Sequence, residues 1–274
     1  MIRQTMFAAI VAGTLLSGCG PTAGAERAAA ASVYADTSIA AAIGAETRTP
    51  ANVARDQYRH PRETLSFFGV EPDDTVVEIW PGGGWYTEIL APLLRERGTY
   101  WAVASERGLN GVRGLIAKDP ATYGQIRLAA FPAQGSDARV PEGSADVVLT
   151  FRNVHNWLMA EPPIGEEAFR QAFAMLKPGG VLGVVDHRLP ESADAARERS
   201  SGYVKVSTVR RLAEAAGFRL AAESEINANP RDTKDHPNGV WSLPPTFRGG
   251  DVDRDRFAAI GESDRMTLKF VKPD

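Results

Sequence analysis

A run of three glycines between a buried strand and a helix constrains this chain more than any other feature. Residues 76–80 form a short apolar strand pattern that contains Glu78, and Pro-Gly-Gly-Gly follows at residues 81–84. A helical pattern then begins at Trp85. Glycine turns the chain sharply and lets the backbone approach a ligand where a Cβ would collide. Because a helix N-terminus also offers unpaired N–H groups, the run predicts a small-molecule pocket at the end of a parallel sheet.

The overall composition is that of an ordinary globular protein. Of the 274 residues, 43% are hydrophobic and 24% are charged, enough for one large domain or two small ones. The net charge of −3 gives no electrostatic case for binding nucleic acid. We therefore expect a small-molecule partner and no nucleic acid.

The N-terminus has the pattern of an export signal. Arg3 precedes an apolar run at residues 6–16, which is shorter than the roughly 20 residues that span a bilayer. Residues 1–18 therefore fit a signal peptide. Leu16-Ser17-Gly18-Cys19 also resembles the lipobox of bacterial lipoproteins, in which the peptide is cut before the cysteine and the cysteine is acylated. That resemblance implies an exported, periplasmic protein held at the outer membrane by lipid on Cys19; a plain signal peptide with an incidental cysteine is the alternative.

The remainder reads as an alanine-rich tether, residues 19–43, followed by one α/β domain, residues 44–274. A helix is predicted over residues 51–68, before strands and helices begin to alternate. The strands are near-continuous apolar runs, as in parallel sheets covered on both faces. Strands are predicted at residues 75–79, 100–104, 126–130, 146–151 and 181–186, and helices at 85–97, 109–118, 166–176 and 207–216. This order predicts a doubly wound sheet with right-handed crossovers.

The C-terminal part departs from this alternation. Residues 219–226 and 266–271 read as strands, and the long polar segment 227–265 separates them. Such a connection belongs at the carboxyl edge of the sheet, where open α/β sheets bind ligands. Connections of this length usually serve as lids or binding loops, so we expect residues 227–265 to form a lid-like insertion. A long surface loop pinned to the core by Trp241 is the alternative.

Several motifs together resemble the class I S-adenosylmethionine-dependent methyltransferases. They are the cofactor loop Glu78 to Gly84, the acid and strand at residues 136–149, the strand entry at residues 176–182 and the last helix and turn at residues 212–218. The resemblance covers residues 61–273. It implies a Rossmann-like sheet of seven strands, mostly parallel, with an antiparallel last strand. Residues 81–92 and 152–157 more narrowly resemble a group of exported, lipoprotein-type bacterial methyltransferases.

The resemblance implies S-adenosylmethionine as cofactor and a set of residues that bind it. They are Glu78, Gly82, Gly83, Gly84, Tyr86, Glu106, Asp137 and Asn153. In the family, the counterpart of Glu78 lies near the methionine amine, and that of Asp137 accepts from the adenine amino group. Two positions depart from the pattern, because Trp80 stands where the first glycine is usual and Ala104 where an acid usually holds the ribose. Glu106 either takes that acid's role or is a solvated loop residue.

The acceptor side is predicted from the ends of the fourth and fifth strands. His155 is the best candidate for a general base, because imidazole titrates near neutrality; a turn-capping histidine is the alternative. Asp186 is expected to orient a substrate amine or to coordinate a metal, and His187 is the third catalytic candidate. Since a metal needs three or four convergent ligands and no local spacing motif provides them, no metal site is expected.

The function predicted is methyl transfer from S-adenosylmethionine to an unidentified small molecule. The alternative is an exported, non-catalytic protein that binds a ligand on the same fold. Export favours the alternative, since the usual methyl donor is made in the cytoplasm, and so do Trp80 and Ala104. A nicotinamide-dependent enzyme is disfavoured, because its glycine pattern would require glycine at Thr87.

Overall fold

The computed structural model describes Met1 and residues 23–274, so the predicted signal peptide beyond Met1, with Cys19, lies outside the described residues. Two compact units are present, Met1–Tyr34 and Ala35–Asp274. Helix α1, Ala23–Ile43, covers most of the predicted tether, as its alanine content favours. Ile39 is buried in the core of the second unit. The second unit therefore begins before residue 44, the predicted start of the domain.

The helix predicted over residues 51–68 is broken into three. Helices α2, Pro50–Val53, α3, Asp56–Arg59, and α4, Pro61–Phe68, replace it. The last break lies at His60, which has a φ of 42°. A residue before proline is disfavoured in the helical region, so the chain cannot continue one helix into Pro61.

The sheet confirms the predicted fold class. Its strands are β1 Thr75–Ile79, β2 Thr99–Val103, β3 Arg127–Ala129, β4 Ala145–Phe151, β5 Leu176–Leu189, β6 Val204–Lys205, β7 Arg219–Ser224 and β8 Arg265–Val271. The order is β3-β2-β1-β4-β5-β8-β7, and the two-residue β6 pairs with β5 away from this path. Among the described strands, β8 alone runs in the opposite direction, so it is antiparallel to its neighbours β5 and β7. The carboxyl ends of the other strands therefore share one edge.

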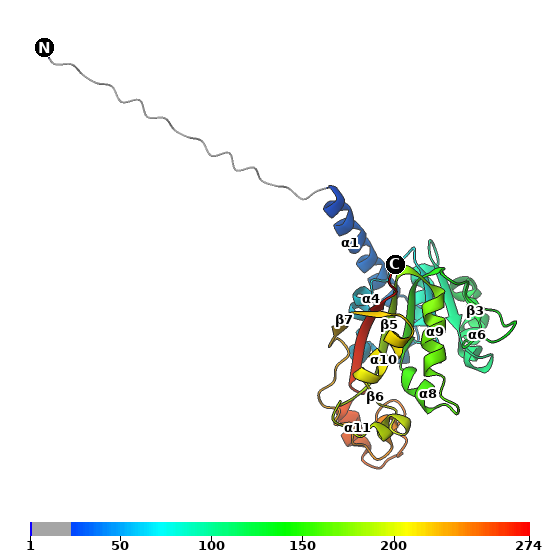
Figure 1. The fold of residues 1–274 in the computed structure, drawn as a ribbon, viewed down its shortest axis with the longest axis vertical. Coiled ribbons are helices and arrows are strands. Elements are labelled where there is room, and N and C mark those ends of the chain that lie inside the picture. The colour runs from blue at the N-terminus through cyan, green and yellow to red at the C-terminus, as the bar shows by residue number, and fades with distance from the viewer. Residues whose placement is uncertain (2–22) are drawn as a thin grey trace. The chain divides into compact units, whose positions relative to one another are not determined.

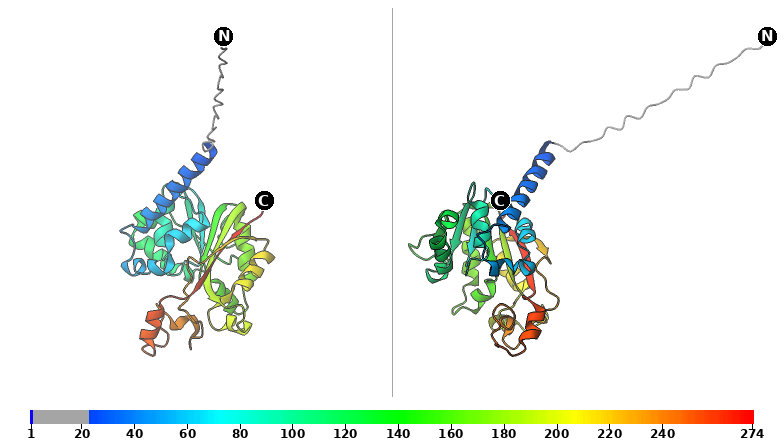
Figure 2. Two further views of the ribbon diagram at one scale, coloured as in Figure 1. Left: turned by 90° about the vertical axis from the view of Figure 1, so that its left-hand side faces the viewer. Right: turned by 180° about the vertical axis from the view of Figure 1, so that it is seen from behind.

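Helices cover both faces of the sheet (Figures 1 and 2). They are α5 Thr87–Leu94, α6 Asn110–Lys118, α7 Pro120–Tyr123, α8 Val154–Met159, α9 Gly165–Met175, α10 Val206–Ala215 and α11 Arg254–Ile260, with 3-10 turns η1 Arg107–Leu109, η2 Ala195–Arg199 and η3 Gly239–Ser242. Because successive strand residues face opposite ways, Val77 packs in one core with Phe169, while Val76 packs in a second core with Leu90.

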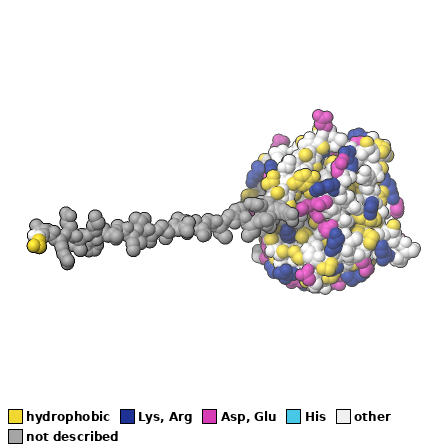
Figure 3. Space-filling view, turned by 90° about the horizontal axis from the view of Figure 1, so that it is seen from above, with side chains coloured by type: hydrophobic (Ala, Val, Ile, Leu, Met, Phe, Trp, Pro, Cys, Tyr) yellow, Lys and Arg dark blue, Asp and Glu magenta, His cyan; other side chains and the backbone are white. Residues whose placement is uncertain are grey.

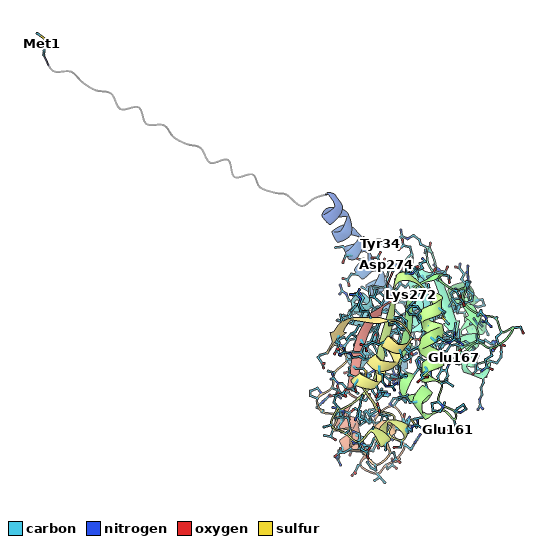
Figure 4. The ribbon with its side chains drawn as sticks, in the orientation of Figure 1. Met1, Tyr34, Glu161, Glu167, Lys272 and Asp274 are labelled. Carbon is cyan, nitrogen blue, oxygen red and sulfur yellow. The ribbon has the colours of Figure 1, made fainter. Side chains whose placement is uncertain are left out.

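The C-terminal segment is fastened at the edge opposite the carboxyl ends. Lys272, labelled in Figure 4, donates from Nζ to the carbonyls of Phe173 (2.9 Å) and Leu176 (2.7 Å), which end α9. A cation stabilises a helix C-terminus in this way.

Figure 3 shows basic and acidic side chains interspersed on the face at this end. No helix among residues 23–274 is long and apolar enough to cross a membrane.

The predicted insertion leaves the carboxyl end of β7 and returns to the start of β8. It contains η3 and α11, and in Figure 1 it occupies the end of the molecule where β6 and α8 lie. Its placement follows from the topology, since β7 runs parallel to β5 and ends at the same edge. Residues 227–265 therefore adjoin the strand ends that carry the predicted site.

Candidate functional site

The glycine run forms the turn between β1 and α5, and its three glycines differ in what they do. Gly82 (φ +59°) and Gly83 line a cavity, and a Cβ built on either meets no atom within 4 Å. A Cβ on Gly84 would lie 2.6 Å from Leu115 Cδ1, and Gly84 also has a φ of +84°. Gly84 was predicted to bind cofactor; in the structure, the absence of a side chain at Gly84 lets this turn pack closely against Leu115 of α6.

Glu78 is the acid at the end of β1, and it is buried beside the glycine turn. Its Oε2 accepts hydrogen bonds from the hydroxyls of Thr87 (3.2 Å) and Tyr100. Its Oε1 accepts none from the described residues, and Glu78 lines the same cavity as Gly83. Burial raises the pKa of Glu78 to about 7, while the two hydroxyls oppose the shift. A cation arriving in the cavity would therefore favour ionisation of this carboxyl.

We call this space of about 180 Å³ the glycine cavity. Two more of the predicted cofactor-binding residues, Tyr86 and Asn153, line this cavity. Tyr86 stacks on Phe151 with 3.6 Å between ring centroids. Asn153 donates from Nδ2 to the carbonyl of Ile79 (2.8 Å) and to Thr150 Oγ1 (3.2 Å), so its amide nitrogen ties β4 to the end of β1. The side chain of Asn153 thus supports the turn as well as lining the cavity.

A second space of about 420 Å³, the strand-2 cavity, lies at the ends of β2 and β3. It is lined by Ala104, Glu106 and Asp137 among others. Glu106 is 87% exposed and pairs with Arg113 at 2.7 Å. Asp137 accepts from the backbone N–H of Gln134 (2.9 Å) through Oδ2 and so also shapes its own turn. Both predicted acids reach the cavity, each with a second, structural partner.

Trp80 lies between these two cavities and lines both. It has a φ of 52°, a conformation that glycine adopts readily and tryptophan rarely does. Its indole Nε1 donates to the carbonyl of Phe131 (3.1 Å), and its ring packs edge-on to Trp157. The backbone therefore keeps the shape of a glycine turn, and Trp80 is a wall residue that the strand-2 cavity and the glycine cavity share.

The three catalytic candidates converge. His155 Nδ1 donates to Asp186 Oδ1 at 2.8 Å, and the backbone N–H of His155 donates to Oδ2 at 3.1 Å. The backbone N–H of His187 reaches Oδ1 at 2.7 Å. Asp186 is fully buried, so it does not reach a substrate amine as predicted; it positions the two histidines. His187 Nδ1 lies 2.5 Å from Ser263 Oγ of the insertion.

Both imidazoles line a third space of about 230 Å³, the insertion cavity. Arg152 and Asn156 complete its floor, and the insertion supplies the other wall, which consists of Val240, Trp241, Pro244, Pro245, Thr246, Glu262 and Ser263. His155 Nε2 and His187 Nε2 make no hydrogen bond within the described residues. Since each Nδ1 is engaged, the Nε2 atoms are the ones available to a ligand. Burial, His155 and Arg152 together hold the pKa of His187 well below its usual range.

A cluster of arginines borders the glycine and insertion cavities. Glu262 pairs with Arg55 (2.6 Å), Arg59 (3.2 Å) and Arg265 (3.2 Å). These guanidiniums and that of Arg152 hold the pKa of Glu262 at about 2, against the effect of burial. The cluster was not expected, because its members are distant in the sequence; Arg152 next to His155 was the one signal that could have pointed to it.

These surroundings bear on metal binding. His155, Asp186 and His187 each offer a ligand atom, all within 4.8 Å of one another. The oxygens of Asp186 already accept three N–H groups, and Arg152 lies close enough to depress the pKa of His187. Positive charge nearby disfavours a divalent cation. The group is better suited to orienting imidazoles than to holding a metal.

The insertion's other histidine lies elsewhere. His236 is buried, donates from Nε2 to Asp232 Oδ1 at 2.8 Å, and packs edge-on to Phe257, so it does not line the insertion cavity. Arg248 is exposed and lies over the ring of Trp241, with 4.5 Å between its guanidinium carbon and the ring centroid.

No protein-family model matches the chain, and no curated protein matches it in sequence. Solved structures match it in fold. One is an S-adenosylmethionine-dependent methyltransferase from Aquifex aeolicus, with a TM-score of 0.54 and 14% identity over 86% of this chain and 98% of that one. Another is the [4+2]-cyclase SpnF, with a TM-score of 0.53 and 14% identity over 89% of this chain and 95% of that one. At such identities the likeness shows the class I methyltransferase fold alone.

Proposed function

We propose that this protein binds S-adenosylmethionine across the strand-2 and glycine cavities and transfers its methyl group to a small molecule in the insertion cavity. The observation that carries the proposal is the chain of shared walls between the three cavities. Trp80 lines the first two, and Arg152 lines the second and third. A donor that spans the first two would therefore end beside the third.

The polar groups of the donor have partners in this arrangement. The adenine and ribose would lie in the strand-2 cavity, within reach of Asp137 and Glu106. The donor ammonium would lie against Glu78 Oε1, and its carboxylate against Nη2 of Arg55 and Arg59, two buried atoms without a hydrogen-bond partner. Gly83 leaves the space that a methionyl chain requires.

The reaction would be an in-line displacement at the donor methyl. Positioning supplies most of the rate gain in such a reaction. His155, held by Asp186 with Nδ1 protonated, presents Nε2 as the group that accepts a proton from the acceptor. A general base of this kind adds about 10²–10⁴-fold.

The direct test is calorimetric titration of the purified protein with S-adenosylmethionine and with its demethylated product. We expect both to bind at a 1:1 ratio and a nicotinamide dinucleotide not to bind. Absence of binding by both ligands would contradict the proposal, whatever the acceptor.

A second candidate is a ligand-binding protein without methyl transfer. Trp80 favours it, since a bulky side chain replaces the usual glycine at a residue that lines both of the cavities that the donor would occupy. The [4+2]-cyclase SpnF also has a similar fold. If this candidate is correct, Trp80→Gly binds S-adenosylmethionine and the wild type does not. Comparable donor binding by both proteins would remove the argument from Trp80, and methyl transfer to an acceptor would then have to be measured directly.

We also propose that the protein is exported and anchored by lipid at Cys19. The pattern Leu16-Ser17-Gly18-Cys19 at the end of an apolar run supports this. Several acyl chains anchor firmly where one does so only marginally. Cys19→Ala should move the protein out of the membrane fraction, and a mature chain that still begins at Met1 would contradict the proposal.

A further inference from the structure

Positive charge exceeds negative charge around the glycine and insertion cavities. Arg55, Arg59, Arg152 and Arg265 surround Glu262, and their influence on its pKa shows that all four act on one carboxylate. Asp186 is committed to His155 and His187, and Glu78, with its pKa of about 7, is only partly ionised near neutrality. S-adenosylmethionine would not remove the excess, since it carries a net positive charge itself.

Arg152 is the member of this cluster without a partner. Arg55, Arg59 and Arg265 each contact Glu262, whereas the guanidinium of Arg152 makes no hydrogen bond or ion pair within residues 23–274. Burial and the neighbouring arginines lower its pKa to about 10, which leaves it charged at neutral pH. Arg152 is half-buried, and Glu262 and Asp186 attract it through space without contacting it. A partly desolvated cation that lacks a direct carboxylate contact is stabilised by a ligand anion that pairs with it.

The backbone of Arg152 adds an independent observation. Its φ is 64°, although it is neither glycine nor asparagine, and its N–H donates to the carbonyl of Val185 at 2.7 Å. The β4–β5 ladder therefore holds Arg152 in a strained conformation where β4 ends. Strain of this kind, about 1–3 kcal/mol, is concentrated at functional sites.

Nη2 of Arg59 and of Arg55 is likewise buried and without a partner, and Arg59 is only 3% exposed. One anionic group from the donor accounts for these two atoms. It does not account for Arg152, which also lines the insertion cavity beside His155 and His187. The opposite wall of that cavity carries the indole of Trp241 and the ring of Pro244.

We propose that the methyl acceptor is a small organic acid whose anionic group pairs with Arg152 while its apolar part lies against Trp241 and Pro244. That the bound acid is the methyl acceptor rests on the proposed function. The anion-binding site at Arg152 does not depend on the proposed function. A planar carboxylate or a phosphate suits the guanidinium fork, which binds either in a bidentate manner. The anion would lie within the cavity that both Nε2 atoms face.

The test uses benzoate, phenyl phosphate and the neutral isostere benzamide as probes, titrated into the full protein saturated with the demethylated donor product. We expect benzoate or phenyl phosphate to bind and benzamide to bind at least tenfold more weakly. Preference for one of the two anions identifies a carboxylate or a phosphate as the matching group. Equal binding of benzoate and benzamide, or no binding of either anion, would overturn the proposal.

Variants assign the site. Arg152→Gln should weaken binding of the preferred anion at least tenfold. Arg210→Gln, at an exposed arginine of α10 that pairs with Glu214 and Glu223, should leave that affinity unchanged. Should Arg152→Gln fail to fold, phenylglyoxal labelling of the wild type replaces it, since the anion but not benzamide should protect Arg152. Unchanged affinity in a folded Arg152→Gln, or no protection of Arg152, would overturn the assignment.

The two proposals fail separately. If the donor product does not bind while the anion still depends on Arg152, methyl transfer is wrong and the anion site stands. If the product binds and the anion does not, methyl transfer stands and the organic-acid acceptor is wrong. If the anion competes with the demethylated product, the anion binds in the proposed donor site, the strand-2 and glycine cavities. That result would overturn the proposal that the anion binds as acceptor in the insertion cavity.

Discussion

His155 Nδ1 and Asp186 Oδ1 lie 2.8 Å apart, and the backbone N–H of His155 reaches the other oxygen of the same carboxylate. A carboxylate only accepts, so the imidazole proton is on Nδ1 and the lone pair is on Nε2. Asp186 thereby fixes both the tautomer and the ring orientation of His155, from a position that no ligand reaches.

Asp186→Asn should therefore reverse the tautomer of His155. An amide can donate to Nδ1, which would leave the proton on Nε2 and remove the lone pair from the insertion cavity. We expect turnover to fall by about 10²-fold or more with donor affinity unchanged, and the imidazole ¹⁵N shifts of His155 to exchange. Asp232→Asn is the matched control, because Asp232 holds His236 in a similar buried pair away from the cavity. An unchanged ¹⁵N pattern in Asp186→Asn would contradict the assignment.

The pKa of Glu78 predicts a pH-dependent stability. The pKa of Glu78 is about 7 in the folded protein, above the ordinary 4.5. The contribution of Glu78 to the free energy of unfolding is therefore full below about pH 4.5 and is lost as pH rises through about 7. Relative to Glu78→Gln, the wild type should lose up to about 3 kcal/mol of unfolding free energy across this window, at 1.36 kcal/mol per pKa unit. Denaturant titrations at pH 4.5, 6 and 7.5 measure this, and a constant difference would refute it.

The same carboxyl predicts a pH-dependent affinity. A donor ammonium beside Glu78 stabilises the ionised form, so donor binding should strengthen several-fold between pH 6 and 7.5. Glu78→Gln should bind more weakly and show a flat profile over that range. Parallel profiles in the two proteins would mean that Glu78 does not face the ligand.

Gly83 and Gly84 should respond differently to substitution. A Cβ at 83 lies in the glycine cavity and meets no protein atom within 4 Å, so we expect Gly83→Val to fold and to lose donor affinity at least tenfold. An Ala at 84 meets Leu115 in an unfavourable φ, so Gly84→Ala should lose about 1–3 kcal/mol of stability and retain donor affinity per folded molecule. Melting temperatures and calorimetry on both variants separate the effects; equal affinity losses would argue against this division.

Glu262→Gln should destabilise the fold strongly at neutral pH. It leaves Arg55, Arg59 and Arg265 without their shared carboxylate, and breaking a buried pair in this way costs about 3–5 kcal/mol. Since the pKa of Glu262 is lowered to about 2, its contribution is full above pH 4.5 and is lost as pH falls through about 2. Glu225→Gln, which removes an exposed partner of Arg188, should cost less than about 1 kcal/mol. Similar losses in both variants would contradict a special role for Glu262.

The sheet was predictable because each central strand is an apolar run with a turn signal at its carboxyl end. Periodicity also identified α5, α6, α9 and α10 to within a few residues. The division of residues 51–68 at His60 was missed, although Pro61 is a sufficient physical signal. Short elements such as β6 and α8 carry too few residues for a pattern.

Site residues could be predicted to lie together only where they come at the carboxyl ends of adjacent strands. His155 and Asp186 could be paired, because the carboxyl ends of β4 and β5 are adjacent. The arginine cluster could not, since Arg59, Arg152 and Glu262 come from three segments that meet only in the folded chain. Asp186's burial and Gly84's contact with Leu115 likewise depend on tertiary packing.

The location of Trp80 gives this protein an internal fluorophore at the boundary of the proposed donor site. Its indole donates to the carbonyl of Phe131 and contacts Trp157, so its emission depends on that environment. A ligand that extends from the strand-2 cavity into the glycine cavity passes Trp80, which lines both, and should change the surroundings of the ring. Ligand binding should then change the tryptophan emission without any added label. The rate of that change would report the rearrangement of the indole, as a step distinct from the first encounter with the ligand.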